Sequence, residues 1–180
     1  AQPFYFTKSL TALVASPAVV PFPPRTQDYH HEIELVVAIG AAGHKVAVQD
    51  AAKLVYGYAA GLDMTRRDLQ WAAKQAGLPW DTGKDVEGGA VCSAIAPMPG
   101  QLLTEADITL KVNGQQRQAG NINQLIWGVA EIIADLSTYY HLQPGDLIYT
   151  GTPEGVAPVQ PGDVLEGQVQ GVGSVRLQLT

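Results

Sequence analysis

Short apolar runs, separated by glycine, proline and polar residues, follow one another along most of the chain. Runs of this length are typical of β-strands joined by turns. The strands that we expect are Phe4–Phe6, Ala12–Val14, Glu32–Ile39, Tyr58–Leu62, Ala90–Ala96, Ile108–Val112, Gln115–Gln118, Leu147–Tyr149, Val164–Val169 and Val175–Leu179. Turn sequences precede several of them, namely Asn113-Gly114, Pro144-Gly145-Asp146 and Pro161-Gly162-Asp163.

Three longer segments carry helical spacing instead. The pattern predicts helices over Val48–Tyr56, Thr65–Gln75 and Asn123–Leu136, with Gly77 as a C-terminal cap of the second. Neither a fixed-period repeat nor a linker divides the chain. We therefore expect one domain over residues 1–180, of the α+β class and mostly β.

Charge and hydropathy exclude two classes of partner. The 180 residues carry a net charge of −6 and no cluster of lysine and arginine, which is a poor match to a nucleic-acid backbone. No apolar stretch approaches the ~20 residues that a membrane span requires. We expect neither nucleic acid nor a membrane as a partner.

Cys92 is the only cysteine, so the chain can form neither an internal disulfide nor a cysteine-based zinc site. Its apolar neighbours indicate a buried strand and an inert thiol. These features favour a reducing compartment, and we expect a cytoplasmic protein. The chain starts at Ala1 without an initiator Met or a signal-peptide pattern, so we expect that its beginning is truncated.

Two glutamates, Glu32 and Glu34, start the strand expected at residues 32–39. Because strand side chains alternate between faces, both carboxylates leave the same face. A hard divalent cation relieves the repulsion between them, since Mg²⁺, Mn²⁺ and Ca²⁺ prefer oxygen ligands. Asp63, at a strand-to-helix junction, is the candidate third ligand. The alternatives are a solvated strand face for the glutamates and a helix N-cap for Asp63.

Two further features could bind an anion. Lys84 follows a turn-like stretch and could hold a carboxylate or stabilise an enolate, although an isolated lysine is usually a surface residue. In the segment Thr150–Val156, glycines flank Thr152, so backbone N–H groups and a hydroxyl could converge on an anion. A plain surface turn explains the same segment equally well.

Together these stretches resemble the fumarylacetoacetate hydrolase family, and within it the single-domain acylpyruvases and fumarylpyruvate hydrolases. The resemblance runs from about Phe4 to Leu179. It is carried by four segments in the family's order: His30-His31-Glu32-Ile33-Glu34-Leu35, Gly61–Gln70, Leu110–Gly114 and Pro144–Pro153.

The resemblance implies a mixed, rolled β-sheet with peripheral helices, usually in a homodimer. It implies Mg²⁺ or Mn²⁺ on Glu32, Glu34 and Asp63, with Ca²⁺ a further candidate. It assigns a catalytic role to Lys84, and it assigns substrate contacts to three residues: Arg67, Gln70 and Thr152.

The implied chemistry is hydrolysis of a carbon–carbon bond in a 1,3-diketo acid, with fumarylpyruvate or another acylpyruvate as substrate and pyruvate as one product. Related enzymes activate the water with a His and a Glu on a lid segment that precedes the start of this chain, so we do not expect the general base here. Asp85-Val86-Glu87-Gly88 after Lys84 also departs from the family, which often has an aromatic residue and an Asp there. The alternatives are an oxaloacetate decarboxylase, which needs no such base, a hydratase or isomerase of related muconate chemistry, and an inactive metal-binding homologue.

Overall fold

The computed structural model describes residues 2–180, which form two curved sheets and a small third one. The first sheet has the strand order β1 (Leu13–Ala15), β7 (Ala90–Cys92), β5 (Val55–Asp63), β4 (Ile33–Ile39) and β11 (Leu147–Tyr149), with β8 (Ala96–Pro97) also paired to β5. The second runs β10 (Gln115–Asn121), β9 (Asp107–Val112), β13 (Val164–Val169), β14 (Gly173–Leu179) and β2 (Ala18–Val20). The third is β12 (Pro158–Val159), β3 (Tyr29–His30) and β6 (Thr65–Arg66).

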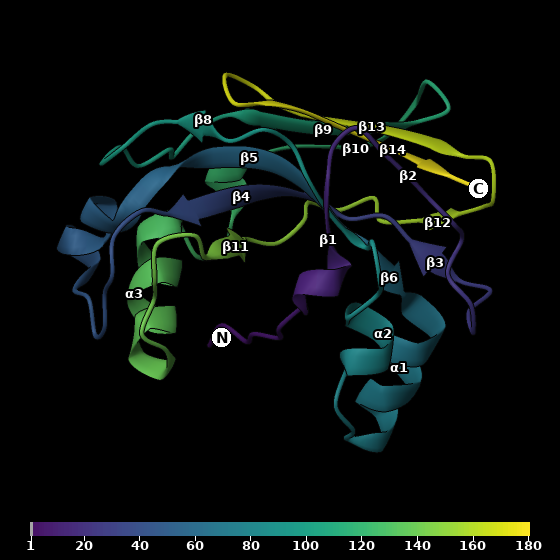
Figure 1. Ribbon diagram of the computed structural model, residues 1–180, viewed down its shortest axis with the longest axis horizontal. Helices are drawn as coiled ribbons and strands as arrows, with labels where there is room; N and C mark the ends of the chain where they lie inside the picture. The colour runs from purple at the N-terminus through teal and green to yellow at the C-terminus, as the bar shows by residue number, and fades with distance from the viewer. Residues whose placement is uncertain (1) are drawn as a thin grey trace.

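The helices are few and lie on one side of the curved sheets. They are η1 (Leu10–Ala12), η2 (Val48–Leu54), α1 (Arg67–Ala76), α2 (Asp81–Lys84), η3 (Ile122–Gln124) and α3 (Val129–Tyr139), where η marks a 3₁₀ helix. Figure 1 shows α3 below one end of the arch, α1 and α2 below the other, and the N-terminal segment between them. This arrangement confirms the expected fold class, a mostly β structure with a curled sheet and peripheral helices.

The hydrophobic core lies between the first two sheets. Every residue of β4 is buried, whereas β13 alternates buried and less buried positions, as expected for a strand with one face toward the core. The sheets approach closely at Gly167, where an added Cβ would lie 2.4 Å from Cδ1 of Ile33. A side chain at this position would push the second sheet away from β4, the strand that carries the candidate metal ligand Glu34.

Several turns form as the sequence predicts. Asn113 and Gly114 both have positive φ angles and join β9 to β10 as a hairpin. Gly77 ends α1 with a φ of 64°, the left-handed C-terminal cap. In the two Pro-Gly-Asp turns, Asp146 and Asp163 each accept a hydrogen bond from the backbone N–H three residues earlier.

Other expected boundaries were wrong. Residues 4–6 form no strand, and the expected helix at 48–56 is a 3₁₀ helix that gives way to β5 at Val55. Thr65 belongs to β6, so α1 begins at Arg67. The expected strand at 90–96 is split into β7 and β8.

The expected helix at Asn123–Leu136 is interrupted in the middle. Asn121 caps η3 by accepting a hydrogen bond from the backbone N–H of Asn123, and this short helix ends at Gln124. The chain then leaves helical geometry until Gly128, the N-cap of α3. Local capping therefore overrides the apolar periodicity, and Leu125 lies outside α3.

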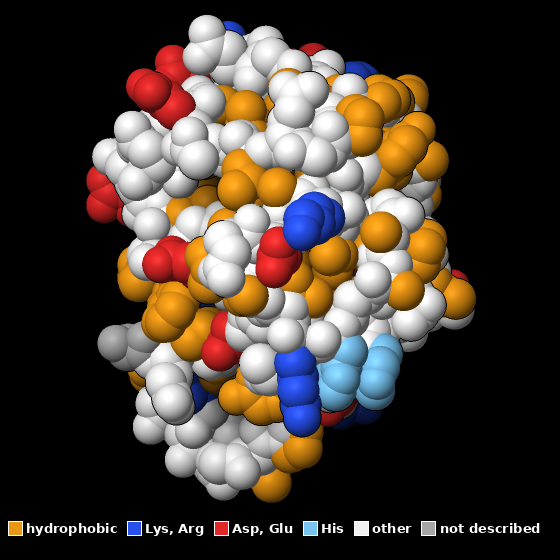
Figure 2. Space-filling view, turned by 90° about the vertical axis from the view of Figure 1, so that its left-hand side faces the viewer, with side chains coloured by type: hydrophobic (Ala, Val, Ile, Leu, Met, Phe, Trp, Pro, Cys, Tyr) orange, Lys and Arg blue, Asp and Glu red, His pale blue; other side chains and the backbone are white. Residues whose placement is uncertain are grey.

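Two surface features complete the description. Figure 2 views the molecule from the side that carries α3 in Figure 1, where exposed hydrophobic side chains form several separate groups. Tyr56, Tyr139 and Tyr140 are among the exposed aromatic residues of the chain. Within residues 2–180, no helix has the length and apolar character needed to cross a membrane.

Candidate metal and active site

Backbone pairing between β4 and β5 brings the candidate metal ligands together. Glu34 is the second residue of β4, and Glu32 immediately precedes that strand. Asp63 ends β5 and donates its backbone N–H to the carbonyl oxygen of Glu32 at 2.9 Å. Directly opposed residues of an antiparallel pair point to the same face, so Asp63 joins the two glutamates there.

The three carboxylates form a buried cluster. Each offers an oxygen atom, and these atoms lie within 4.8 Å of one another. Only 6% of Glu32, 4% of Glu34 and 2% of Asp63 is exposed, so the solvated strand face is excluded. Asp63 is not a helix cap either, because α1 begins four residues later and Arg66 is its N-cap.

Burial of this negative charge has a clear electrostatic consequence. Desolvation raises the pKa of Glu34 well above its ordinary value of 4.5, and the neighbouring charges of Asp63 and Glu32 raise it further. A cluster of three hard oxygen donors that resists full ionisation fits a divalent cation such as Mg²⁺ or Mn²⁺.

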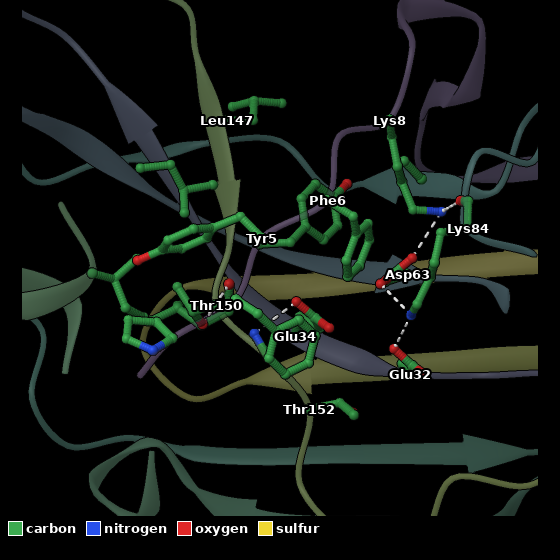
Figure 3. Close-up of a pocket in the computed structure, with 18 of the residues that line it drawn as sticks. Tyr5, Phe6, Lys8, Glu32, Glu34, Asp63, Lys84, Leu147, Thr150 and Thr152 are labelled. Atoms are coloured by element: carbon green, nitrogen blue, oxygen red, sulfur yellow. Dashed lines mark hydrogen bonds and ion pairs between the residues drawn. The ribbon is translucent and has the colours of Figure 1, made fainter. Parts of the chain in front are cut away.

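Lys84, the last residue of α2, lies directly beside this cluster (Figure 3). Its ammonium group donates to Glu32 Oε2 at 2.7 Å, to Asp63 Oδ2 at 2.8 Å and to Thr65 Oγ1 at 2.8 Å. Burial alone would lower the pKa of Lys84, but Asp63 and Glu32 outweigh burial and raise it. Lys84 is therefore a buried, charged lysine and not a surface residue.

Arg67 and Gln70 lie one helical turn apart at the start of α1. Arg67 donates to Gln70 Oε1 at 2.6 Å through one guanidinium nitrogen and pairs with Glu32 through the other. Both residues line the same cavity as the acids. The structure thus brings together all the candidate residues from the first half of the chain.

Sequence reasoning missed Lys8 and Phe6 in the N-terminal segment. Lys8 Nζ lies 2.7 Å from Asp63 Oδ1 and also donates to the carbonyl oxygens of Met64 and Lys84. The ring of Phe6 lies 4.8 Å from Lys84 Nζ, in a cation–π arrangement. A single lysine after an aromatic run carries no signal for such a position, because the contact depends on how the segment crosses the concave side.

The segment Thr150–Val156 forms the opposite wall, and its first glycine binds a carboxyl group. The backbone N–H of Gly151 donates to Glu34 Oε2 at 2.8 Å, so the group that it binds is a side chain of this protein. Thr152 lines the cavity. Gly155 has a φ of 99°, and a Cβ there would lie 2.4 Å from the carbonyl oxygen of Arg117, so this wall packs tightly on β10.

Each histidine next to the acids has one ring nitrogen engaged by a neighbouring side chain. His30 Nε2 lies 2.7 Å from Asp28 Oδ1, and His31 is fully buried with Nδ1 2.9 Å from Gln118 Oε1. Burial lowers the pKa of His31, which keeps the ring neutral near pH 7. Gln118 also went unrecognised in the sequence, because a glutamine in a polar strand looks like a solvated residue.

All the candidate residues line one cavity on the concave side of the sheets. Its volume is about 1830 Å³, and it is open to solvent. Glu32, Glu34 and Asp63 contribute buried carboxyl groups to its lining, while Lys84 and Thr152 lie on different sides of Glu34 (Figure 3). The cavity is large enough for a small organic acid, which would meet buried acids, one buried lysine and an apolar wall.

The close contact between Gly155 and β10 can be tested by adding one methyl group. We expect Gly155→Ala to lower the free energy of unfolding by about 2–3 kcal/mol, since it adds a backbone clash to the strain of a positive φ. Gly162→Ala is the matched control, because Gly162 has a φ of 92° with open space around it. If urea unfolding shows that both variants lose the same free energy of unfolding, the contact with Arg117 is not tight.

The raised pKa of Glu34 predicts pH-dependent metal binding. At a pH below this raised pKa, the cation must displace a proton, so Mn²⁺ affinity should fall by up to about tenfold per pH unit as the pH decreases. Calorimetric titration between about pH 8 and about pH 5.5, in buffers of different ionisation enthalpy, measures both affinity and proton release. A Mn²⁺ affinity independent of pH, with no proton released on binding, would contradict the assignment of Glu34 as a metal ligand with a raised pKa.

Comparison with known proteins places the chain in a family. A family model described as fumarylacetoacetate (FAA) hydrolase C-terminal matches residues 1–180. A fumarylpyruvate hydrolase from Ralstonia sp is 61% identical over 176 residues, covering 98% of this chain and 92% of that protein. A mitochondrial oxaloacetate decarboxylase from Dictyostelium discoideum is 37% identical, covering 95% of this chain and 79% of that protein.

Solved structures show the same likeness. The crystal structure of fumarylpyruvate hydrolase from Pseudomonas aeruginosa in complex with Mn²⁺ and pyruvate superposes with a TM-score of 0.97. Its sequence is 41% identical, and the match covers 100% of this chain and 79% of that one. The buried acids, the adjoining lysine and these matches agree, and the chain belongs to the fumarylacetoacetate hydrolase family.

Proposed function

We propose that this protein is a metal-dependent hydrolase that cleaves a carbon–carbon bond in fumarylpyruvate or another acylpyruvate, giving pyruvate and a carboxylic acid. The observation that carries the proposal is the buried triad of Glu32, Glu34 and Asp63 with Lys84 beside it. The 61% identity to a fumarylpyruvate hydrolase and the similarity to a fumarylpyruvate hydrolase crystallised with Mn²⁺ and pyruvate support the choice of substrate.

The triad would hold Mg²⁺ or Mn²⁺, the ions that its oxygen donors fit. Bound there, either ion would act as a Lewis acid that polarises the 2-oxo acid and offsets the negative charge developed in the reaction. Gly151 contributes by donating its backbone N–H to Glu34 Oε2, which fixes the direction of that carboxylate. Arg67 does the same for Glu32.

In the reaction, water adds to the carbonyl carbon distal to the carboxylate, and the bond to the pyruvate carbon then breaks. The electron pair of that bond remains on the pyruvate fragment as an enolate, which takes up a proton. Lys84 is the charged group placed to stabilise the enolate, and it would deliver that proton by turning one N–H from a protein oxygen toward the substrate. Arg67, Gln70 and Thr152 would hold the substrate in the orientation that this sequence of steps requires.

The side chains described here also limit the choice of the base that activates water. His31 does not line the cavity, and its Nδ1 is engaged by Gln118. The amino group of Lys84 is charged and directs its hydrogen bonds to three protein oxygens. We therefore assign the water-activating role to neither residue.

The finer expectations belong to the same proposal. We propose that residues 1–180 act as one catalytic domain, that two copies assemble as a homodimer, and that the protein works in the cytoplasm with Mg²⁺ or Mn²⁺. The second candidate function is decarboxylation of oxaloacetate, which needs the same charge stabilisation without an added water and is supported by the relative from Dictyostelium discoideum. An inactive homologue is less favoured, because the triad and Lys84 are intact.

One set of assays separates these functions. The protein is incubated with Mn²⁺ and, in turn, with fumarylpyruvate, acetylpyruvate and oxaloacetate, and the products are quantified. We expect equimolar pyruvate and fumarate from the first substrate, and no product after EDTA treatment. Turnover of oxaloacetate alone would favour the decarboxylase, and cleavage of neither diketone by protein that binds Mn²⁺ would overturn the proposal.

A further inference from the structure

A β-bulge in β10 turns one polar side chain into the protein interior. The pairing with β9 runs from Gln116 opposite Lys111 to Gln118 opposite Leu110, so that Arg117 is the additional residue. A bulge of this kind redirects the side chains that follow it. Gln118 is only 1% exposed, while the side chains before and after it lie at the surface. A buried amide needs partners for both its oxygen and its nitrogen.

Two backbone groups fix the direction of the Gln118 amide. The backbone N–H of Ile33 can only donate, and it donates to Gln118 at 3.1 Å, so the atom that it meets is the oxygen Oε1. The carbonyl oxygen of Pro153 can only accept, and it accepts from Gln118 at 2.8 Å, so the atom on that side is the nitrogen Nε2. A flipped amide would lose both bonds.

The fixed amide also fixes its two side-chain neighbours. Because Oε1 accepts, His31 must carry its proton on Nδ1, which lies 2.9 Å away. Because Nε2 donates to Thr152 Oγ1 at 2.8 Å, the hydroxyl oxygen of Thr152 acts as an acceptor in that bond. The hydroxyl proton is therefore not used toward Gln118, and no described residue accepts it.

Thr152 lines the cavity that contains the acids (Figure 3). A hydroxyl whose lone pair is engaged on the protein side can direct its proton toward the cavity. We propose that Gln118 is a positioning residue that polarises Thr152, so that Thr152 donates a hydrogen bond to the carboxylate of the 2-oxo acid. This inference rests on the proposed function, and it adds a residue that does not line the cavity itself.

The test reverses the direction of the hydrogen bond while keeping the side chain's shape. In Gln118→Glu, the carboxylate can accept from Ile33 and His31 but cannot donate to Thr152, so it draws the hydroxyl proton away from the cavity. Gln118→Met removes every bond and leaves the hydroxyl free to rotate. A purely structural role predicts that methionine is at least as harmful as glutamate, whereas the polarising role predicts that glutamate is worse.

Pyruvate binding to the Mn²⁺-loaded protein is the readout. We expect Thr152→Val and Gln118→Glu each to weaken pyruvate binding by about tenfold or more, because each removes a hydrogen bond to a charged group. Gln118→Met should lose clearly less than Gln118→Glu, and Thr152→Ser should retain binding. The double variant Thr152→Val/Gln118→Glu should bind pyruvate as Thr152→Val does, since no hydroxyl remains to be oriented.

Two controls distinguish an effect on the direction of the Thr152 hydroxyl from a displacement of the whole segment Thr150–Val156. Mn²⁺ affinity should be unchanged in all variants, because a shifted loop would break the bond from Gly151 to Glu34 and weaken metal binding. With fumarylpyruvate, KM should rise in Gln118→Glu while kcat changes less, as for a loss of uniform substrate binding. If Gln118→Glu does not fold, Gln118→Met takes its place in the double-variant comparison.

The outcomes distinguish this inference from the proposed function. Additive losses in the double variant, equal or greater damage by methionine, or unchanged pyruvate binding in Thr152→Val would each overturn the role of Gln118. If the variants bind pyruvate with the expected relative affinities but the wild-type protein does not cleave fumarylpyruvate, the proposed function is overturned and the inference stands.

Discussion

Lys84→Met should lower kcat for fumarylpyruvate cleavage by about 10³-fold, while Mn²⁺ binding remains measurable. Methionine keeps most of the length of the lysine stem but removes the charge that lies between Glu32 and Asp63. The loss falls on kcat because the enolate charge and its protonation exist only after the carbon–carbon bond begins to break. Rates are measured by product formation at saturating Mn²⁺.

The same substitution should destabilise the metal-free protein. Glu32 and Asp63 would then lose their shared cation, while Arg67 still pairs with Glu32 and Lys8 with Asp63. The loss should therefore stay below the ~3–5 kcal/mol typical of a buried charge left unpaired. Lys53→Met is the matched control, because 75% of the Lys53 side chain is exposed and its ion pair lies at the surface. Activity of Lys84→Met within about tenfold of wild type would contradict the catalytic role. Complete loss of Mn²⁺ binding in Lys84→Met would show that Lys84 is needed to form the metal site, and its effect on kcat could then not be assigned to the reaction.

Glu34→Gln should weaken Mn²⁺ binding by more than about 100-fold, and activity should disappear with it. Loss of a group that only orients a metal ligand costs about 10–100-fold, and loss of the ligand's charge should cost more. The glutamine oxygen can still accept the hydrogen bond from Gly151, so the loop should stay in place. Calorimetry with Mn²⁺ and the fumarylpyruvate assay measure the two effects on the same preparation.

The raised pKa of Glu34 also predicts how the stability of this variant depends on pH. A carboxyl group whose pKa is raised on folding stabilises the fold at low pH, and this stability is lost as the pH rises through the raised pKa. Glutamine is neutral at every pH, so metal-free Glu34→Gln should be at least as stable as wild type, with the difference growing toward alkaline pH. Glu166→Gln, with 56% of the Glu166 side chain exposed, is the control. Clear destabilisation of Glu34→Gln at alkaline pH would argue that Glu34 is ionised and paired in the metal-free protein.

Local pattern was sufficient to predict that two of the three candidate metal ligands share a face. The two-residue spacing of Glu32 and Glu34 predicts a shared face, and the structure confirms it for strand β4 and the residue before it. The position of Asp63 was harder to predict, because its place opposite Glu32 depends on the register between β4 and β5. Spacing alone favoured a solvated face and a helix cap, and only the ordered set of motifs favoured the metal site.

Contacts between distant segments could not be predicted from the sequence. Lys8 reaches Asp63 because the N-terminal segment crosses the concave side of the sheets (Figure 1), and no periodicity in that segment reports the crossing. Gln118 reaches Thr152 because a bulge in β10 rotates it inward. In both cases a single polar residue is placed by tertiary packing, and its local sequence resembles that of a surface residue.

Anomalous diffraction from crystals grown with Mn²⁺ tests the central claim most directly. The account predicts one strong peak among the carboxylates of Glu32, Glu34 and Asp63, at about 2.0–2.2 Å from an oxygen atom of each, and no peak in crystals of Glu34→Gln. A peak elsewhere in the protein, with the three carboxylates still held only by Lys84, Lys8, Arg67 and Gly151, would contradict it.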